Sequence, residues 1–139
     1  MNQPVFSIVI PLFNKEKYIG RTIDSILSQK FGNFEVIIVN DGSTDSSLSI
    51  VSQYTDKRIR IINKPNEGVS ATRNRGMSEA KGELVCFLDA DDVLLPNALV
   101  EFMRLRKTKN CDIYAASFVE KTPSDCISKN AICTNGFFK

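Results

Sequence analysis

Short apolar runs alternate along the chain with segments whose apolar residues recur at helical spacing. The runs lie at residues 5–12, 36–40, 60–63 and 84–88, and residues 112–119 are a candidate fifth. They are continuously apolar and rich in β-branched residues, a pattern that is typical of strands buried on both faces of a parallel sheet. We therefore expect at least four strands in a parallel arrangement.

Four helices are predicted from apolar positions that are three or four residues apart. The stripes that define them are Ile19, Ile23, Ile26 and Leu27; Leu48, Val51 and Tyr54; Val69, Met77 and Ala80; and Leu99, Phe102 and Met103. Strands and helices in alternation predict an α/β fold, with an open, mostly parallel sheet and helices on both faces. We expect one domain over residues 1–119, followed by an irregular polar tail over 120–139.

The composition excludes several kinds of chemistry. The 139 residues include no His, and 18 Lys and Arg against 16 Asp and Glu leave a net charge of only +2. Without His there can be no Ser-His-Asp triad, no His-ligated zinc and no imidazole acid or base. The small net charge argues against a nucleic acid as the main partner. No segment has the pattern of a signal peptide or a membrane span, so we expect a cytoplasmic protein.

Ligands of open α/β sheets bind beyond the carboxyl ends of the strands, so the residues at those ends are the candidate binding residues. The segment after the first strand has no glycine before Gly20, and no GxxxxGK[ST] motif occurs in the chain. Nicotinamide enzymes of the GxGxxG type and P-loop NTPases are therefore excluded.

Carboxylates follow the second and the fourth strand. Asp41 closes the second strand and faces the expected crevice, where it can accept hydrogen bonds from a base or a ribose, whereas the next residues, 43–45, fit a turn and a helix N-cap. Asp89 and Asp91 follow the fourth strand and lie on one face of an extended chain, roughly 6.5 Å apart. We expect them to serve one ligand together, with Asp92 as a turn residue.

Arg73 falls on the predicted apolar stripe of the third helix, between Val69 and Met77. A guanidinium on a face that meets a sheet needs an anion as partner. Two compatible interpretations follow: Arg73 neutralises a carboxylate such as Asp89, or it helps to hold an anionic ligand. Arg75 is turned away and is expected to face solvent.

Four segments carry a family resemblance in the correct order and spacing. They read SIVIPLFNKEKYIGRTIDSILSQ, FEVIIVNDGSTDSS, NEGVSATRNRG and GELVCFLDADDVLLPNAL. Together they resemble the successive motifs of family 2 glycosyltransferases of the GT-A fold, from about residue 5 to about residue 99. The resemblance covers the nucleotide-sugar-binding part of such enzymes, and the tail over 120–139 would be the start of an acceptor-side region.

The resemblance implies roles for single residues. Those expected to bind the nucleotide are Pro11, Phe13 and Asn14 at the base and ribose, Asp41 at the base, Arg73 beside the nucleotide and Asp89 near the ribose. Asp91 would bind the Mg²⁺ or Mn²⁺ that grips the diphosphate, and a hard cation suits carboxylate ligands. No residue is assigned as the catalytic base, which we expect to lie outside this chain.

The implied activity is a metal-dependent, inverting transfer of a sugar from a nucleoside-diphosphate donor to an acceptor hydroxyl. Uridine diphosphate (UDP) sugar is the donor expected from the family, and the acceptor would be a carbohydrate or a lipid-linked molecule. The alternative is a non-catalytic nucleotide-sugar-binding module, or one completed by a partner chain. A homodimer, a location at the inner face of the membrane and a role in polysaccharide synthesis are further expectations.

Overall fold

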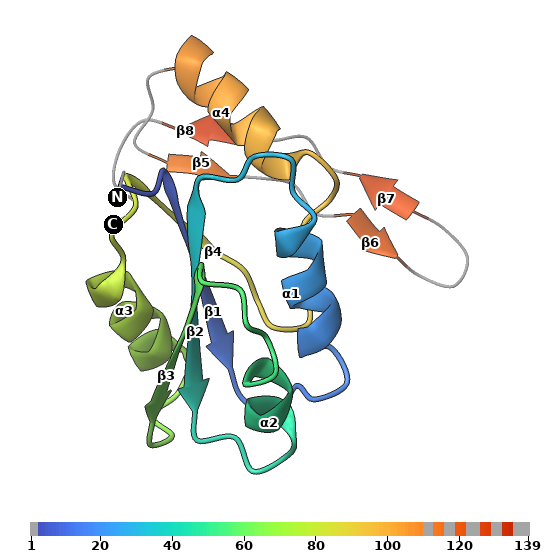
Figure 1. Ribbon diagram of the computed structural model, residues 1–139. Coiled ribbons are helices and arrows are strands. Elements are labelled where there is room, and N and C mark those ends of the chain that lie inside the picture. Colours follow the sequence, from blue (N-terminus) through green and yellow to red (C-terminus); the bar gives the residue numbers. More distant parts are fainter. Residues whose placement is uncertain (1–2, 110–112, 116–118, 122–125, 129–131, 135–139) are drawn as a thin grey trace. The chain divides into compact units, whose positions relative to one another are not determined.

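A computed structural model describes residues 3–109, 113–115, 119–121, 126–128 and 132–134 (Figure 1). Its elements are β1 (Phe6–Leu12), α1 (Ile19–Leu27), β2 (Phe34–Asp41), α2 (Ser47–Val51), β3 (Ile59–Lys64), α3 (Val69–Glu79), β4 (Leu84–Phe87), α4 (Ala98–Thr108), β5 (Ile113–Ala115), β6 (Val119–Lys121), β7 (Cys126–Ser128) and β8 (Ile132–Thr134). The chain divides into two compact units, Met1–Asn97 and Ala98–Lys139.

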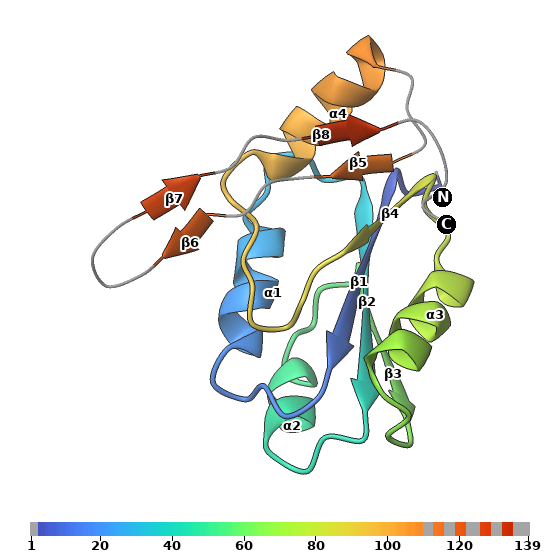
Figure 2. The ribbon, with the colours of Figure 1, turned by 180° about the vertical axis from the view of Figure 1, so that it is seen from behind.

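The first unit is built on a four-stranded sheet in the order β3-β2-β1-β4, in which all neighbours are parallel. Helices α1 and α2 cover one face of this sheet and α3 covers the other, as Figures 1 and 2 show from opposite sides. The predicted α/β fold with a parallel sheet and helices on both faces is therefore confirmed.

The two central strands supply most of the core. The fully buried side chains of β1 and β2 include Ile8, Val9, Ile10, Leu12, Val36, Ile37, Ile38 and Val39. Strand β4 differs, because Val85 and Phe87 are exposed while their neighbours are half-buried. The prediction that this run is buried on both faces is wrong, because Val85 and Phe87, two residues apart, share one face of β4 and both are exposed there.

Helix α1 buries the predicted stripe, but α3 does not. Val69 and Met77 are each 51% exposed, and the buried residues of α3 are Thr72 and Gly76. A Cβ built on Gly76 would lie 2.2 Å from Cγ1 of Val9, so the helix backbone itself rests on the sheet. Hydrophobic spacing cannot identify a face made of small residues, which explains the error.

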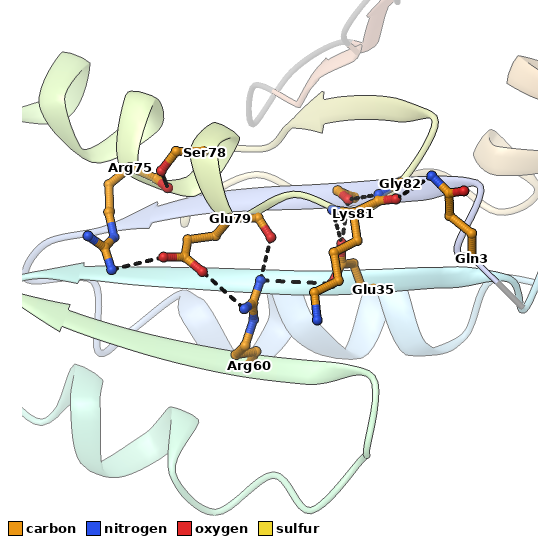
Figure 3. Close-up of polar contacts among 9 residues, drawn as sticks. Gln3, Glu35, Arg60, Arg75, Ser78, Glu79, Lys81 and Gly82 are labelled. Atoms are coloured by element: carbon orange, nitrogen blue, oxygen red, sulfur yellow. Dashed lines mark hydrogen bonds and ion pairs between the residues drawn. The ribbon is translucent and has the colours of Figure 1, made fainter. Parts of the chain in front are cut away.

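A polar network fixes the connection from α3 to β4 against the first two strands (Figure 3). The Oε1 atom of Glu35 accepts hydrogen bonds from the Ser7 hydroxyl at 2.6 Å and from the Lys81 N–H at 2.7 Å. The Gly82 N–H in turn donates to the Ser7 hydroxyl at 2.8 Å. The buried polar groups at this end of the sheet thus satisfy one another.

The same network reaches the last turn of α3 through β3. Arg60 donates to the Glu79 carboxylate at 3.1 Å and to the Glu79 carbonyl at 2.5 Å, and its guanidinium lies 4.0 Å from Glu35. Arg75 pairs with Glu79 at 2.9 Å and is half-exposed, in agreement with its predicted place on the solvent side (Figure 3). Hydrogen bonds and ion pairs therefore fix the C-terminal end of α3 against β2 and β3. Because the helix is rigid, they also determine the position of its N-terminal end.

Asp56 gives the fold a dependence on pH. Three hydrogen bonds from Arg58, at 2.8–3.0 Å, lower the pKa of Asp56 to about 2. Because this pKa lies below that of the unfolded chain, the pair stabilises the protein above about pH 4 and stops doing so as the pH falls to about 2.

Asp56→Asn is therefore expected to lower the free energy of unfolding at pH 7 by up to about 2 kcal/mol, and by progressively less in acid. Urea unfolding of both proteins at pH 7, 4 and 2.5 measures this. A difference that stays constant across the series would contradict the assignment.

The second unit contains α4 and two short antiparallel pairs, β5 with β8 and β6 with β7. The candidate fifth strand at 112–119 is seen in part as β5, which pairs with β8 and not with the parallel sheet. Within 120–139, the described residues of β6, β7 and β8 are extended, although no regular structure was expected there. The domain boundary at residue 119 stays a prediction.

Among the described helices, none has the length and apolar character needed to cross a bilayer.

Candidate functional site

A pocket of about 590 Å³ opens in the first unit, beyond the carboxyl ends of β1, β2 and β4. Its walls come from the ends of β1 and β2, from the loops after β1, β3 and β4, and from the N-terminal half of α3. The lining residues are Pro11, Leu12, Phe13, Lys15, Asp41, Asn66, Gly68, Val69, Thr72, Arg73, Asp89, Ala90 and Asp91. The pocket therefore lies where the strand-end rule places ligands.

Most of the residues singled out from the sequence meet in this pocket. Six of the seven predicted site residues line it: Pro11, Phe13, Asp41, Arg73, Asp89 and Asp91. The seventh, Asn14, is not among the lining residues. Residues from four separate segments are thus gathered around one space, and their individual roles stay predictions.

Asp41 is buried, with 4% of its surface exposed, and its carboxylate is fully engaged. Oδ1 accepts hydrogen bonds from Lys64 Nζ at 2.5 Å and from the Glu67 N–H at 2.9 Å, and Oδ2 accepts from the Gly68 N–H at 3.0 Å. Burial opposes ionisation, but the hydrogen bonds from Lys64 and Glu67 outweigh it and hold the pKa of Asp41 below its ordinary value. Asp41 therefore anchors the loop that leads into α3.

Gly68 is the point at which this loop turns into α3. Its φ of +88° lies in the region that only glycine adopts freely, and its N–H points to Asp41 in that conformation. The Thr72 hydroxyl then donates to the Gly68 carbonyl at 2.7 Å. This arrangement places Gly68 and Thr72 on the pocket wall, and neither was predicted.

Arg73 forms an ion pair with Asp89 at 2.6 Å. Of the two interpretations of Arg73, the neutralisation of Asp89 is thus seen directly. Both side chains remain part of the pocket lining, so the second interpretation is compatible with it. Among the described side chains, Arg73 Nε is a buried polar atom that has no hydrogen-bond partner.

Lys15 is the main residue that the sequence analysis missed. Its Nζ donates to Asp91 Oδ2 at 2.6 Å, and this hydrogen bond lowers the pKa of Asp91 and raises that of Lys15. The sequence did point to it, since Lys15 stands in the loop that follows the first strand, where ligands are expected.

Asp92 lines no part of the pocket, and its N–H donates to the Asp89 carbonyl at 3.0 Å, as expected of a turn residue.

Asn14 links two loops. Its side-chain Oδ1 accepts from the Thr44 N–H at 2.8 Å and from the Asp45 N–H at 3.3 Å, and its Nδ2 donates to the Thr44 hydroxyl at 3.2 Å. Its backbone has a φ of +49°, a left-handed conformation that Asn tolerates better than most residues. Asn14 therefore ties the loop after β1 to the loop after β2 and directs the chain into Lys15.

Two substitutions separate these contributions of Asn14. Asn14→Gly keeps the backbone conformation and loses the side-chain hydrogen bonds, whereas Asn14→Ala loses both, at about 1–3 kcal/mol in total. Thermal unfolding should rank the wild type above Asn14→Gly and Asn14→Ala last. If the alanine variant is as stable as the wild type, Asn14 does not hold the two loops.

The described residues contain no cluster of three or more His, Cys, Asp or Glu side chains that is arranged to hold a metal ion. The donor chemistry of the pocket nevertheless suits Mg²⁺ or Mn²⁺. These ions are commonly bound by one or two carboxylates together with phosphate oxygens and water, and Asp89 and Asp91 both face the pocket. The residues present therefore fit a metal ion that arrives with a phosphorylated ligand.

Comparison with known proteins gives a consistent result. The family model described as Glycosyl transferase family 2 matches residues 7–128. The putative glycosyltransferase EpsH of Bacillus subtilis is 38% identical over 106 residues, which are 75% of this chain and 31% of EpsH. The chondroitin synthase of Pasteurella multocida is 42% identical over 114 residues, which are 78% of this chain and 12% of the synthase.

A solved structure shares the fold. The crystal structure of residues 1–349 of S. aureus TarS in complex with UDP-GlcNAc matches with a TM-score of 0.79 and 29% identity, over 89% of this chain and 37% of that one. The chain thus spans about a third of the length of EpsH and of the TarS structure, and much less of the synthase.

Proposed function

This chain belongs to glycosyl transferase family 2, and from that membership and the pocket we propose that it binds a nucleoside-diphosphate sugar as the donor in a sugar transfer. The proposal rests most heavily on one observation. The ends of β1 and β2, the loops after β1, β3 and β4 and the start of α3 converge on one pocket. It holds three carboxylates, Asp41, Asp89 and Asp91, and two cations, Lys15 and Arg73.

The pocket offers suitable contacts for each part of such a donor. Phe13 is exposed and contributes an aromatic side chain, and Pro11, two residues before it, also lines the pocket. We propose that they line the base and ribose, with Asp41 holding the loop against which the base rests. Arg73 supplies positive charge beside the nucleotide, and Asp89 is assigned to the ribose. UDP is proposed as the nucleotide because TarS, at 29% identity, was solved with UDP-GlcNAc.

Asp91 is proposed to hold Mg²⁺ or Mn²⁺ together with oxygens of the diphosphate. Bound there, such an ion supplies a Lewis acid that neutralises charge on the departing diphosphate. The chain's own residues orient the donor, and the ion pair with Asp89 keeps the guanidinium of Arg73 beside it. For the transfer we propose inversion at the anomeric carbon, with a carboxylate base that we assign to no residue of this chain.

The other expectations also remain proposals. They are an acceptor that is a carbohydrate or a lipid-linked molecule, a role in polysaccharide synthesis, a cytoplasmic location at the inner face of the membrane, and a homodimer. The proposed role in polysaccharide synthesis is supported by the similarity to a chondroitin synthase, which is named for a polysaccharide product.

Thermal unfolding with UDP tests the binding step. We expect UDP to raise the melting temperature when Mn²⁺ or Mg²⁺ is present and to have little effect with a chelator, because the chelator removes the ion that Asp91 would hold. Guanosine and adenosine diphosphates are the controls for base preference. If no nucleoside diphosphate changes the melting temperature with either metal, the proposal fails.

Release of UDP from UDP-sugars separates catalysis from binding. Turnover with or without an added sugar acceptor supports a transferase. Metal-dependent binding with no turnover favours the alternative, a nucleotide-sugar-binding module that a partner completes.

A further inference from the structure

An ion pair inside the pocket joins Lys15 to Asp91. Nζ lies 2.6 Å from Oδ2, and the two side chains are 38% and 41% exposed. Both residues line the pocket, so the pair stands on its wall and is accessible to a ligand. Exposed ion pairs of this kind are weak, which means that a stronger cation can separate them.

The backbone of Lys15 is held by several hydrogen bonds, whereas its ammonium is held by the exposed pair with Asp91. Its N–H donates to the Ser47 hydroxyl at 2.8 Å, and its carbonyl accepts from the N–H groups of Tyr18 at 2.9 Å and Ile19 at 3.0 Å. These bonds fix the Cα position at the entrance to α1. The four-carbon stem can therefore carry the ammonium between neighbouring anions without any change in the loop.

The neighbouring groups leave the ammonium few other partners. Asp89 is already paired with Arg73 at 2.6 Å, and the Tyr18 ring, 6.0 Å from Nζ, offers a cation–π contact outside the pair. A diphosphate that enters the pocket would be the strongest new anion within reach. The carboxylate that Lys15 pairs with is the one proposed to hold the divalent ion.

We propose that Lys15 is an internal counter-cation of Asp91 that a divalent metal ion displaces, and that the displaced ammonium then pairs with the diphosphate of the nucleotide. This inference rests on the proposed function and adds a residue to it. Lys15 acts in two opposite ways. It weakens metal binding when no nucleotide is present, and it strengthens nucleotide binding once the metal is in place.

Lys15→Met removes the ammonium and keeps the length and apolar character of the stem. Without nucleotide, Mn²⁺ should bind this variant roughly two- to fivefold more tightly than the wild type, because an exposed ion pair no longer has to be broken. The free Mn²⁺ signal in electron paramagnetic resonance measures this directly. At saturating Mn²⁺, calorimetry should show UDP binding weakened roughly tenfold, since a charged hydrogen bond is lost.

Lys17→Met is the matched control, because Lys17 is an exposed cation of the same loop that does not line the pocket. It removes the same charge, so any effect of net charge alone appears in both variants. Adding Asp91→Asn to Lys15→Met should abolish the gain in Mn²⁺ affinity.

The outcomes separate the inference from the proposed function. Opposite changes in Mn²⁺ and UDP affinity in Lys15→Met alone support the inference. If Lys15→Met and Lys17→Met change Mn²⁺ affinity equally, or if UDP binding is unaffected, the inference is wrong while the donor site stands. If the wild type binds neither Mn²⁺ nor UDP, the inference and the proposed function are both wrong.

Discussion

The Asp91→Asn variant is expected to lose the metal-dependent stabilisation by UDP. A ligand at about 100 times its Kd stabilises a protein by about 2.7 kcal/mol, which corresponds to a melting-temperature shift on the order of 10 °C for a domain of this size. Asparagine keeps the shape of Asp91 but removes the charge that a divalent ion requires. The shift with Mn²⁺ and UDP should therefore fall to the small value seen with a chelator.

The fold itself should tolerate this change, since the Lys15–Asp91 pair is about 40% exposed and such pairs contribute roughly 0–1 kcal/mol. Asp92→Asn is the matched control, because Asp92 is the next residue and does not line the pocket. It should keep the full UDP shift. An unchanged shift in Asp91→Asn would remove the metal role from this residue.

The Gly76→Ala variant is expected to destabilise the protein, although alanine favours helices by up to about 1 kcal/mol relative to glycine. The new Cβ would lie 2.2 Å from Cγ1 of Val9, where carbon atoms normally lie about 3.5–4.0 Å apart. Val9 is fully buried and β-branched, so it has little freedom to move away. Overpacking costs about 1–3 kcal/mol, and we expect a net loss of about 1–2 kcal/mol in urea unfolding.

A second effect should accompany the first. Helix α3 carries Thr72 and Arg73 on the pocket wall, so displacing it from the sheet should also weaken UDP binding. Gly32→Ala is the control, because nothing lies within 4 Å of a Cβ built there. It should change neither stability nor binding. A Gly76→Ala protein that is more stable than the wild type would show that α3 does not rest directly on β1.

Much of the fold was predictable because the apolar pattern is strong where strands and helices bury large side chains. Ile19, Ile23 and Ile26 predict the buried face of α1 correctly. The pattern failed for α3, where Gly76 and Thr72 make the contact and Val69 and Met77 are exposed. The close approach of a helix backbone to buried valine side chains leaves no trace in hydrophobic spacing.

The site was predictable to the extent that strand ends determine it. Asp41 ends β2, Asp89 and Asp91 follow shortly after β4, and parallel strands bring their carboxyl ends to one edge of the sheet. Lys15 and Gly68 were missed because their positions depend on loop hydrogen bonds, which a single sequence does not reveal. Asn14 joins two loops, a role that was not expected, and its predicted place at the ligand stays a prediction.

The strand order also determines when the pocket can form during synthesis of the chain. Strand β1 emerges first but lies in the middle of the sheet, between β2 and β4, and Phe6 pairs with Leu84. One edge of β1 therefore stays open until residues 84–87 have left the ribosome, and pairings between such distant segments form slowly. Asp89 and Asp91 follow within four residues, so two of the three carboxylates of the pocket are synthesised just after the last strand of the sheet. A nascent chain that is interrupted before β4 would expose an apolar strand edge and have only part of a binding site.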